Sequence, residues 1–116
     1  TGIVVISLSS QLSATMQSAE LAARAVAGDI PVRIVDSRSA SMGQGIAAVA
    51  CAKKAAGGAS LDEVAAYAND LAARTQVWAA LDTLENLKKG GRISGSKALL
   101  AFFAKRSNRD NGTKRI

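Results

Sequence analysis

Residues 2–36 decide the fold, and their sequence is GIVVISLSSQLSATMQSAELAARAVAGDIPVRIVD. Two short runs rich in β-branched residues, Gly2–Leu8 and Val32–Asp36, each predict a buried strand. Between them, good helix formers predict a helix from about Leu12 to Ala27, which Pro31 cannot continue. A strand, a helix and a second strand in this order form a βαβ unit, in which the two strands are parallel.

The rest of the chain continues the alternation of helices and strands. Its periodicity and its helix breakers predict a helix over 41–56, a helix that starts at 60, a strand over 75–81, a short helix from 82 or 83 to 88, and a helix over 94–104. Ser60 and Glu63 match the capping box S-x-x-E, which fixes a helix start. The alternation predicts an α/β fold in three layers, a parallel sheet flanked by helices on both faces.

Length and composition fit one folded domain with a basic end. The chain has 116 residues, 48% hydrophobic but only 3% aromatic, so we expect a thin core in which helices pack through small side chains. Five of the 15 Lys and Arg residues lie in 105–116, beside one Asp. We therefore predict an α/β domain, itself incomplete, over 1–104 and a mobile basic tail over 105–116. Without aromatic side chains for base stacking, the tail does not indicate nucleic-acid binding.

Several functional classes are disfavoured by what the sequence lacks. It has no His, the side chain used most often for acid–base catalysis and metal binding, and we assign no catalytic residue and no metal site. No apolar run reaches the roughly 18 residues of a transmembrane span, and no secretory signal opens the chain. The single Cys51 excludes an internal disulfide and suits the cytoplasm. Because the chain starts at Thr1 without Met, we expect it to be part of a longer protein.

Hydroxyl side chains are concentrated where the first predicted strand leads into the first helix. This junction contains Ser7, Ser9, Ser10, Ser13 and Thr15. A helix start has unpaired N–H groups and a partial positive charge, so it attracts anions, and hydroxyls add neutral donors. The loop can therefore hold a carboxylate or a phosphate. The same residues also fit an ordinary loop in which one serine caps the helix.

Two further segments place an arginine in a turn. Asp36–Gly43, with the sequence DSRSASMG, carries Arg38 after a strand end, and Lys88–Ser94, with the sequence KKGGRIS, places Arg92 beside a predicted helix start. Both segments also fit plain capped turns. Gly43 begins a match to G-x-G-x-x-A, but this dinucleotide motif needs its glycines directly after a strand. The match therefore predicts no nucleotide site.

Four stretches carry a family resemblance: SLSSQLSATMQSA at 7–19, VDSRSASMGQG at 35–45, GASLDEV at 58–64 and LDTLENLKKGGRIS at 81–94. In this order and spacing they resemble the DegV family of bacterial fatty-acid-binding proteins. The resemblance implies two domains that bury an acyl chain between them, with hydroxyls and backbone amides of the N-terminal domain holding the carboxylate. Some members are subunits of a fatty acid kinase, and they present the carboxyl group to a separate ATP-using subunit for phospholipid metabolism.

The resemblance also implies a ligand and the residues that bind it. The ligand is a long-chain fatty acid such as palmitate, held without a cofactor, and the chain is not itself an enzyme. Ser10 matches the carboxylate-binding serine, with Ser9 and Ser13 nearby. Arg92 matches an arginine near the mouth that faces the kinase partner. The sequence departs from the family at Ala14, where glycine is usual, and we expect its methyl group to narrow the space beside the carboxylate.

The family's opening strand and its second domain have no counterpart here, so we expect about half a pocket. The missing wall should expose an apolar patch near Leu12, Met42 and Ile93, which is either covered in a homodimer or left on a weakly stable monomer with poor lipid affinity. Two other classes stay open. One is an α/β enzyme that uses the same anion site for a small molecule or a nucleotide phosphate, and the other is a basic interaction module that acts through the tail.

Overall fold

A computed structural model describes residues 1–77 and 85–92. Its elements, in chain order, are β1 (Ile3–Ser7), α1 (Thr15–Ala25), β2 (Val32–Asp36), α2 (Ser41–Ala56), α3 (Leu61–Arg74) and α4 (Glu85–Lys89). The chain divides into two compact units, Thr1–Val77 and Trp78–Ile116. The first unit holds the sheet and three helices, and α4 belongs to the second.

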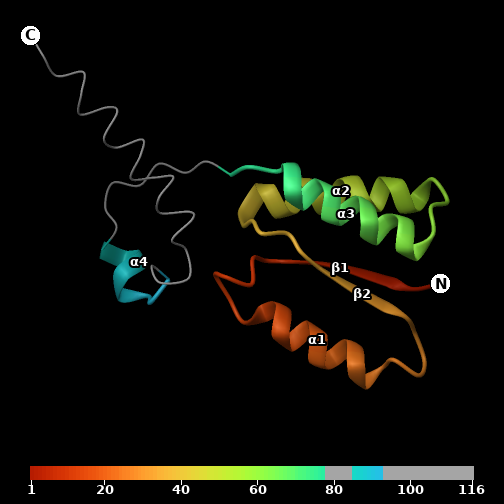
Figure 1. The fold of residues 1–116 in the computed structure, drawn as a ribbon, viewed down its shortest axis with the longest axis horizontal. Helices are drawn as coiled ribbons and strands as arrows, with labels where there is room; N and C mark the ends of the chain where they lie inside the picture. The colour runs from red at the N-terminus through yellow and green to blue at the C-terminus, as the bar shows by residue number, and fades with distance from the viewer. Residues whose placement is uncertain (78–84, 93–116) are drawn as a thin grey trace, which may run out of the picture. The chain divides into compact units, whose positions relative to one another are not determined.

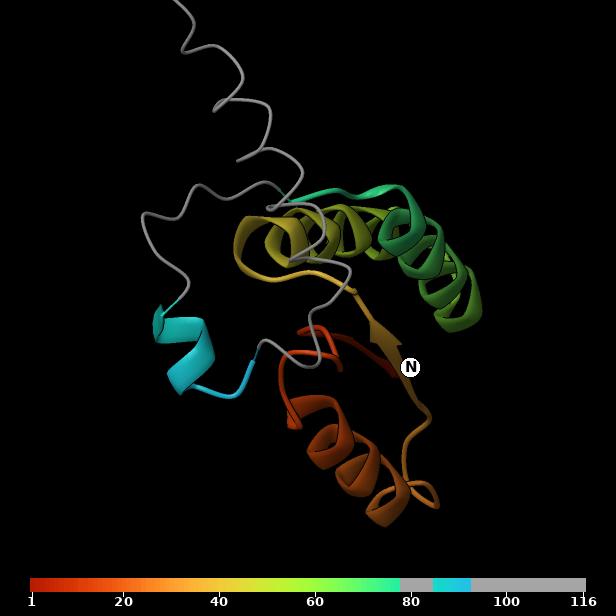
Figure 2. The same cartoon turned by 60° about the vertical axis from the view of Figure 1, so that its left-hand side comes forward.

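The two strands form the centre of the first unit. β1 and β2 are parallel and pair in register from Ile3 opposite Val32 to Ser7 opposite Asp36. α1 lies on one face of this sheet, and α2 and α3 lie side by side on the other (Figures 1 and 2). The predicted α/β fold, a parallel sheet flanked by helices in three layers, is therefore confirmed. Because both strands end at the same edge, the loops that follow them start side by side.

Helix α1 begins later than the sequence predicts. The expected start was about Leu12, whereas the first helical residue is Thr15 and the residue at the N-cap position is Ala14. The carbonyl of Ser9 accepts hydrogen bonds from the N–H groups of Leu12, at 3.0 Å, and of Ser13, at 3.2 Å. These bonds close a separate turn, so the helix starts only after it. By contrast, α2 has the predicted bounds of 41–56.

The core is thin, as the composition predicts, and most of it lies between the sheet and the helices α2 and α3. Its buried residues are Val35, Cys51, Val64, Ala65 and Ala68. None of the larger side chains in the described residues is fully buried. Burial raises the pKa of the Cys51 thiol, so this side chain stays protonated at neutral pH and packs as a small apolar group.

Several predicted elements are only partly covered by the described residues. Residues 75–77 of the expected third strand have no strand structure, and the remainder of that segment lies outside the described residues. The short helix is present as α4 and ends before Gly90 and Gly91, where Gly91 has a φ of +69°. The expected helix over 94–104 and the tail over 105–116 lie outside the described residues, and the domain boundary stays a prediction. None of the described helices is long and apolar enough to cross a membrane.

One face of α2 exposes large apolar side chains. Met42, Ile46 and Val49 are 68%, 59% and 56% exposed, and their spacing of four and three residues places them in one stripe along the helix. Met42 is thus exposed as expected, Leu12 is half-buried, and Ile93 lies outside the described residues. This apolar stripe is a surface that a second domain or a second copy could cover.

The first turn of α2 packs too closely for any side chain at Gly43. A Cβ atom built at Gly43 would overlap the Oγ of Ser39 and the Cγ2 of Val77. Two residues further along the same helix, a Cβ at Gly45 would meet only the Sδ of Met42, at 4.0 Å. The two glycines therefore differ in packing although both lie within one helix.

We predict that Gly43→Ala lowers the free energy of unfolding by about 1–3 kcal/mol, the usual cost of overpacking a closed site. Gly45→Ala is the matched control, and it should be neutral or raise stability by up to about 1 kcal/mol, because alanine is the better helix former. Urea denaturation of the three proteins measures both values. Equal stability of the two variants would contradict the packing described for Gly43.

The capping box at the start of α3 generates a second prediction. The Oγ of Ser60 accepts a hydrogen bond from the N–H of Glu63 at 3.3 Å, and the N–H of Ser60 donates to Oε2 of Glu63 at 2.7 Å. Ser60→Ala should therefore lower the free energy of unfolding by about 1 kcal/mol. Ser18→Ala, an exposed change within α1, should leave it unchanged or slightly higher. Thermal denaturation of both variants tests the difference, and equal effects would rule out a stabilising cap.

Candidate functional site

Two loops meet at the carboxyl edge of the sheet. One follows β1 and leads to α1, and the other follows β2 and leads to α2. The N–H of Ser9 donates to the carbonyl of Ser39 at 2.9 Å, and the N–H of Ser37 donates to the carbonyl of Ser7 at 3.1 Å. These bonds hold the two loops side by side, at the edge where ligands of parallel α/β sheets usually bind.

Asp36, the last residue of β2, ties the two loops together. Its Oδ2 accepts a hydrogen bond from the Oγ of Ser10 at 2.6 Å, and its Oδ1 accepts one from the N–H of Arg38 at 2.8 Å. The N–H of Ser10 also donates to this carboxylate, at 3.3 and 3.4 Å from its two oxygens. Ser10 and Asp36 are 26 positions apart in the chain, so this contact exists only because the strands pair in parallel.

The hydrogen bonds around Asp36 keep its carboxyl group ionised. Partial burial alone would raise its pKa. The hydrogen bond from the Ser10 hydroxyl, the bonds from the backbone N–H groups of Arg38 and Ser10, and the positive charge of Arg38 together lower the pKa below its ordinary value. At neutral pH the centre of this loop cluster is therefore a carboxylate that accepts hydrogen bonds and cannot donate one.

The three serines predicted as ligands lie in one loop but have different surroundings. Ser9 is 6% exposed, and its Oγ accepts a hydrogen bond from the N–H of Gln11 at 3.3 Å. Ser10 is exposed. Ser13 is half-buried, its Oγ lies 2.7 Å from the Oγ1 of Thr15, and it accepts a hydrogen bond from the Thr15 N–H at 3.3 Å. Of the three, Ser10 presents the most accessible hydroxyl to a ligand.

Two further hydroxyls lie at this edge: Ser7, which the sequence placed at the junction without a ligand role, and Ser39, which was not singled out from the sequence. Ser7 and Ser39 are 4% and 5% exposed, and within the described residues their Oγ atoms have no hydrogen-bond partner. Ser39 Oγ lies against Gly43, and the neighbouring Ser37 Oγ donates to the Ser39 carbonyl at 3.3 Å. In the sequence, the serines at 37 and 39 only weakly indicate that their side chains are buried, because serines are also common in solvent-exposed turns.

The backbone is strained within the second loop and at the first residue of α2. Arg38 and Ser41 have φ angles of +51° and +52°, a region that L-residues seldom adopt. Asp36 accepts a hydrogen bond from the N–H of Arg38 in this loop. Gly43 and Gly45 lie inside α2 and not in a turn directly after β2, so the segment lacks the backbone of a dinucleotide-binding loop.

Arg92, the fourth predicted site residue, belongs to the second unit of the chain. It is exposed, and its Nη1 donates to the carbonyl of Gly90 at 2.8 Å. This bond holds the guanidinium over the turn that ends α4. Ser9, Ser10 and Ser13 lie together in one loop of the first unit, whereas Arg92 lies in the second unit.

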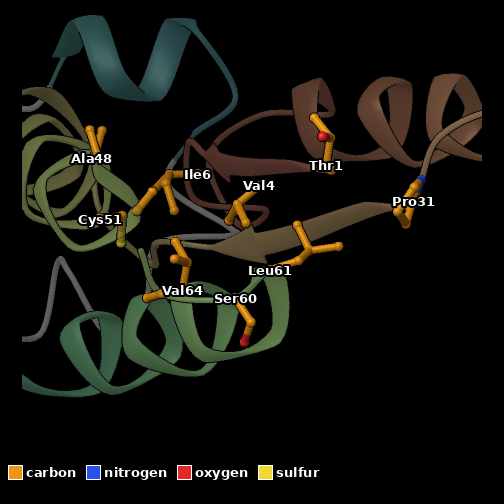
Figure 3. Close-up of a pocket in the computed structure, with 13 residues that line it drawn as sticks. Thr1, Val4, Ile6, Pro31, Ala48, Cys51, Ser60, Leu61 and Val64 are labelled. Atoms are coloured by element: carbon orange, nitrogen blue, oxygen red, sulfur yellow. The ribbon is translucent and has the colours of Figure 1, made fainter. Parts of the chain in front are cut away.

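An open apolar groove with a volume of about 620 Å³ lies beside β1 (Figure 3). Val4 and Ile6 of β1 line one side of the groove, Ala48 and Cys51 of α2 line the other, and Val64 of α3 also lines it. None of the predicted serines lines the groove. Within the described residues, no cluster of three or more His, Cys, Asp or Glu side chains could hold a metal ion.

Comparison with known proteins gives one consistent family. A family model described as "Uncharacterised protein, DegV family" matches residues 1–105. DegV domain-containing proteins of Mycobacterium bovis, Streptomyces coelicolor and Streptococcus pyogenes are 46%, 41% and 36% identical over 99, 98 and 101 residues. These alignments cover 85%, 84% and 87% of the chain but only 35%, 34% and 36% of the relatives.

The chain thus spans about a third of the length of the curated relatives that it matches. The names of these bacterial relatives state a domain and no enzymatic activity. No solved structure gives a significant match. The family model covers most of the chain, and the four stretches that carry the resemblance fall within the matched residues. The chain therefore belongs to the DegV family.

Proposed function

We propose that this chain is the carboxyl-binding part of a fatty-acid carrier. The Ser9–Ser13 loop holds the carboxyl group of a long-chain fatty acid such as palmitate, and no cofactor takes part. The observation that carries the proposal is the exposed Ser10 hydroxyl, in a serine-rich loop at the carboxyl edge of a parallel sheet, in a member of the DegV family.

The start of α1 supports binding of an oxygen-rich group at this loop. Ala14 occupies the N-cap position and provides no side-chain hydrogen bond to the helix. N–H groups in the first turn of a helix need acceptors, and the carbonyl oxygen of a carboxyl group can accept from them. The N–H of Thr15, the first residue of α1, already donates to the Oγ of Ser13 at 3.3 Å, and a ligand oxygen can accept from the N–H groups that follow it in the first turn. Ser13 directly precedes the N-cap residue Ala14, and Ser10 lies in the turn before it.

The carrier acts as a binding subunit and not as the enzyme. It presents the acyl carboxyl group to a separate ATP-using fatty acid kinase subunit in the cytoplasm, with Arg92 near the surface that this partner contacts. The alternative, an α/β enzyme acting on a phosphate, has less support, because the glycines that would form a phosphate loop lie inside α2. The apolar stripe Met42, Ile46 and Val49 supports a second domain or a homodimer as the other wall of the pocket.

Replacement of Ser10 tests the proposed site. In the protein that contains this chain, Ser10→Ala should weaken fatty-acid binding by about 0.5–1.5 kcal/mol, the usual net value of one hydrogen bond. Ser18→Ala, on the exposed surface of α1, should leave the affinity unchanged. Titration calorimetry with a fatty acid measures both constants. Unchanged affinity in a folded Ser10→Ala variant would remove Ser10 from the site.

Replacement of Arg92 tests its role toward the partner. Arg92→Ala should change the free energy of unfolding by less than about 0.5 kcal/mol, as is usual for exposed positions. It should nevertheless reduce acyl-phosphate formation when the protein is combined with a fatty acid kinase subunit. Lys88→Ala, an exposed change within α4, should leave both quantities unchanged. A large loss of stability with normal turnover would assign Arg92 to the fold instead.

A further inference from the structure

The hydrogen bond between Ser10 and Asp36 determines what Ser10 can offer to a ligand. A serine hydroxyl has one hydrogen and two lone pairs, whereas an ionised carboxylate has lone pairs only. At 2.6 Å, Ser10 Oγ and Asp36 Oδ2 are at the short distance typical of a hydroxyl that donates to a carboxylate. The hydrogen of Ser10 therefore points at Asp36. Toward a ligand, Ser10 Oγ is left with lone pairs alone.

The surroundings of Asp36 hold this arrangement in place. The N–H groups of Arg38 and Ser10 both donate to its carboxylate, which orients the plane of the carboxyl group. In the described part of the chain, Arg38 is the one charged group that contributes to the ionisation of Asp36, and its positive charge favours the carboxylate. Ser7, the β1 residue opposite Asp36, has a neutral side chain.

We propose that Asp36 makes the serine loop select the neutral, protonated carboxyl group of a fatty acid over the ionised carboxylate. A protonated acid can donate its hydrogen to the free lone pair of Ser10 Oγ. An ionised acid would instead place negative oxygen against that lone pair and beside the negative charge of Asp36. This inference rests on the proposed function, and it adds the ionisation state of the ligand and a specificity-determining residue to it.

The absence of histidine makes this selectivity measurable from the pH dependence of binding. This chain contains no His, so within it no side chain of ordinary pKa titrates between pH 5 and 8. A probe that cannot ionise responds only to titration of the protein, so the change in fatty-acid affinity relative to such a probe reports the ionisation of the ligand. Dodecanoic acid and 1-dodecanol are a suitable pair of probes, because both are neutral donors at low pH and only the acid ionises.

The first arm of the test uses the unmodified protein. The affinity for dodecanoic acid, divided by that for 1-dodecanol, should fall at least about tenfold from pH 5 to pH 8, since the neutral fraction of a carboxylic acid falls tenfold per pH unit above its pKa. A ratio that is constant or rises with pH would overturn the inference while leaving the proposed function in place. If neither probe binds, the proposed function fails, and the inference fails with it.

The second arm reverses the hydrogen bond. In Asp36→Asn, the side-chain oxygen can still accept from the N–H of Arg38, while the amide NH₂ donates to Ser10 Oγ. The Ser10 hydrogen is then available for a ligand carboxylate. At pH 8 the variant should bind dodecanoate about tenfold more tightly than the unmodified protein, with 1-dodecanol binding changed less than threefold. An unchanged dodecanoate affinity in a folded variant would contradict the inference.

A double-mutant cycle separates the direction of the hydrogen bond from a simple loss of charge. If the direction of the Ser10 hydroxyl matters, the tenfold gain in dodecanoate affinity that Asp36→Asn causes should shrink to less than threefold in a protein that already carries Ser10→Ala. If the gain is the same in both backgrounds, only the negative charge of Asp36 acts, and the role given to Ser10 is wrong. Circular dichroism of each variant checks folding, and the first arm decides the question should Asp36→Asn unfold.

Discussion

The backbone hydrogen bonds between β1 and β2 hold Ser7 opposite Asp36 at the end of both strands. Everything at the candidate site depends on this parallel register. A shift of one residue would turn Asp36 to the other face of the sheet and would separate its carboxylate from Ser10. The two loops also share backbone hydrogen bonds, one of them between Ser9 and Ser39, so their relative position is fixed by the main chain before any side chain contributes.

The electrostatics of the loop cluster follow from its composition. Hydroxyls and backbone N–H groups surround a single carboxylate, and Arg38 is the only cation that contributes to its ionisation in the described part of the chain. An ionised carboxylate is bound through donated hydrogen bonds, which are stronger when the donor carries a charge. This cluster instead presents a hydroxyl whose hydrogen is already committed to Asp36. Its chemistry therefore suits a head group that can donate a hydrogen bond.

The alanine-rich helices give the fold its thin core and its apolar surface. Small side chains allow α2 and α3 to approach the sheet closely, and Gly43 is the extreme case, since a methyl group would not fit there. The residues that α2 buries are small, namely Gly43, Ala47 and Cys51. Met42, Ile46 and Val49 lie exposed on its outer face, and an open apolar groove remains beside β1. Both features fit a chain that spans about a third of its relatives' length.

The sequence by itself determined the elements whose signals are local. The β-branched runs predict both strands, and the capping box at Ser60 and the bounds of α2 follow from propensity and breakers. The start of α1 was misplaced because the Ser9 carbonyl closes a turn ahead of Ala14. Only the tertiary structure decided which serine meets Asp36 and which serines are buried. Burial and hydrogen bonds between residues 26 positions apart depend on strand register and loop path, which local sequence patterns do not encode.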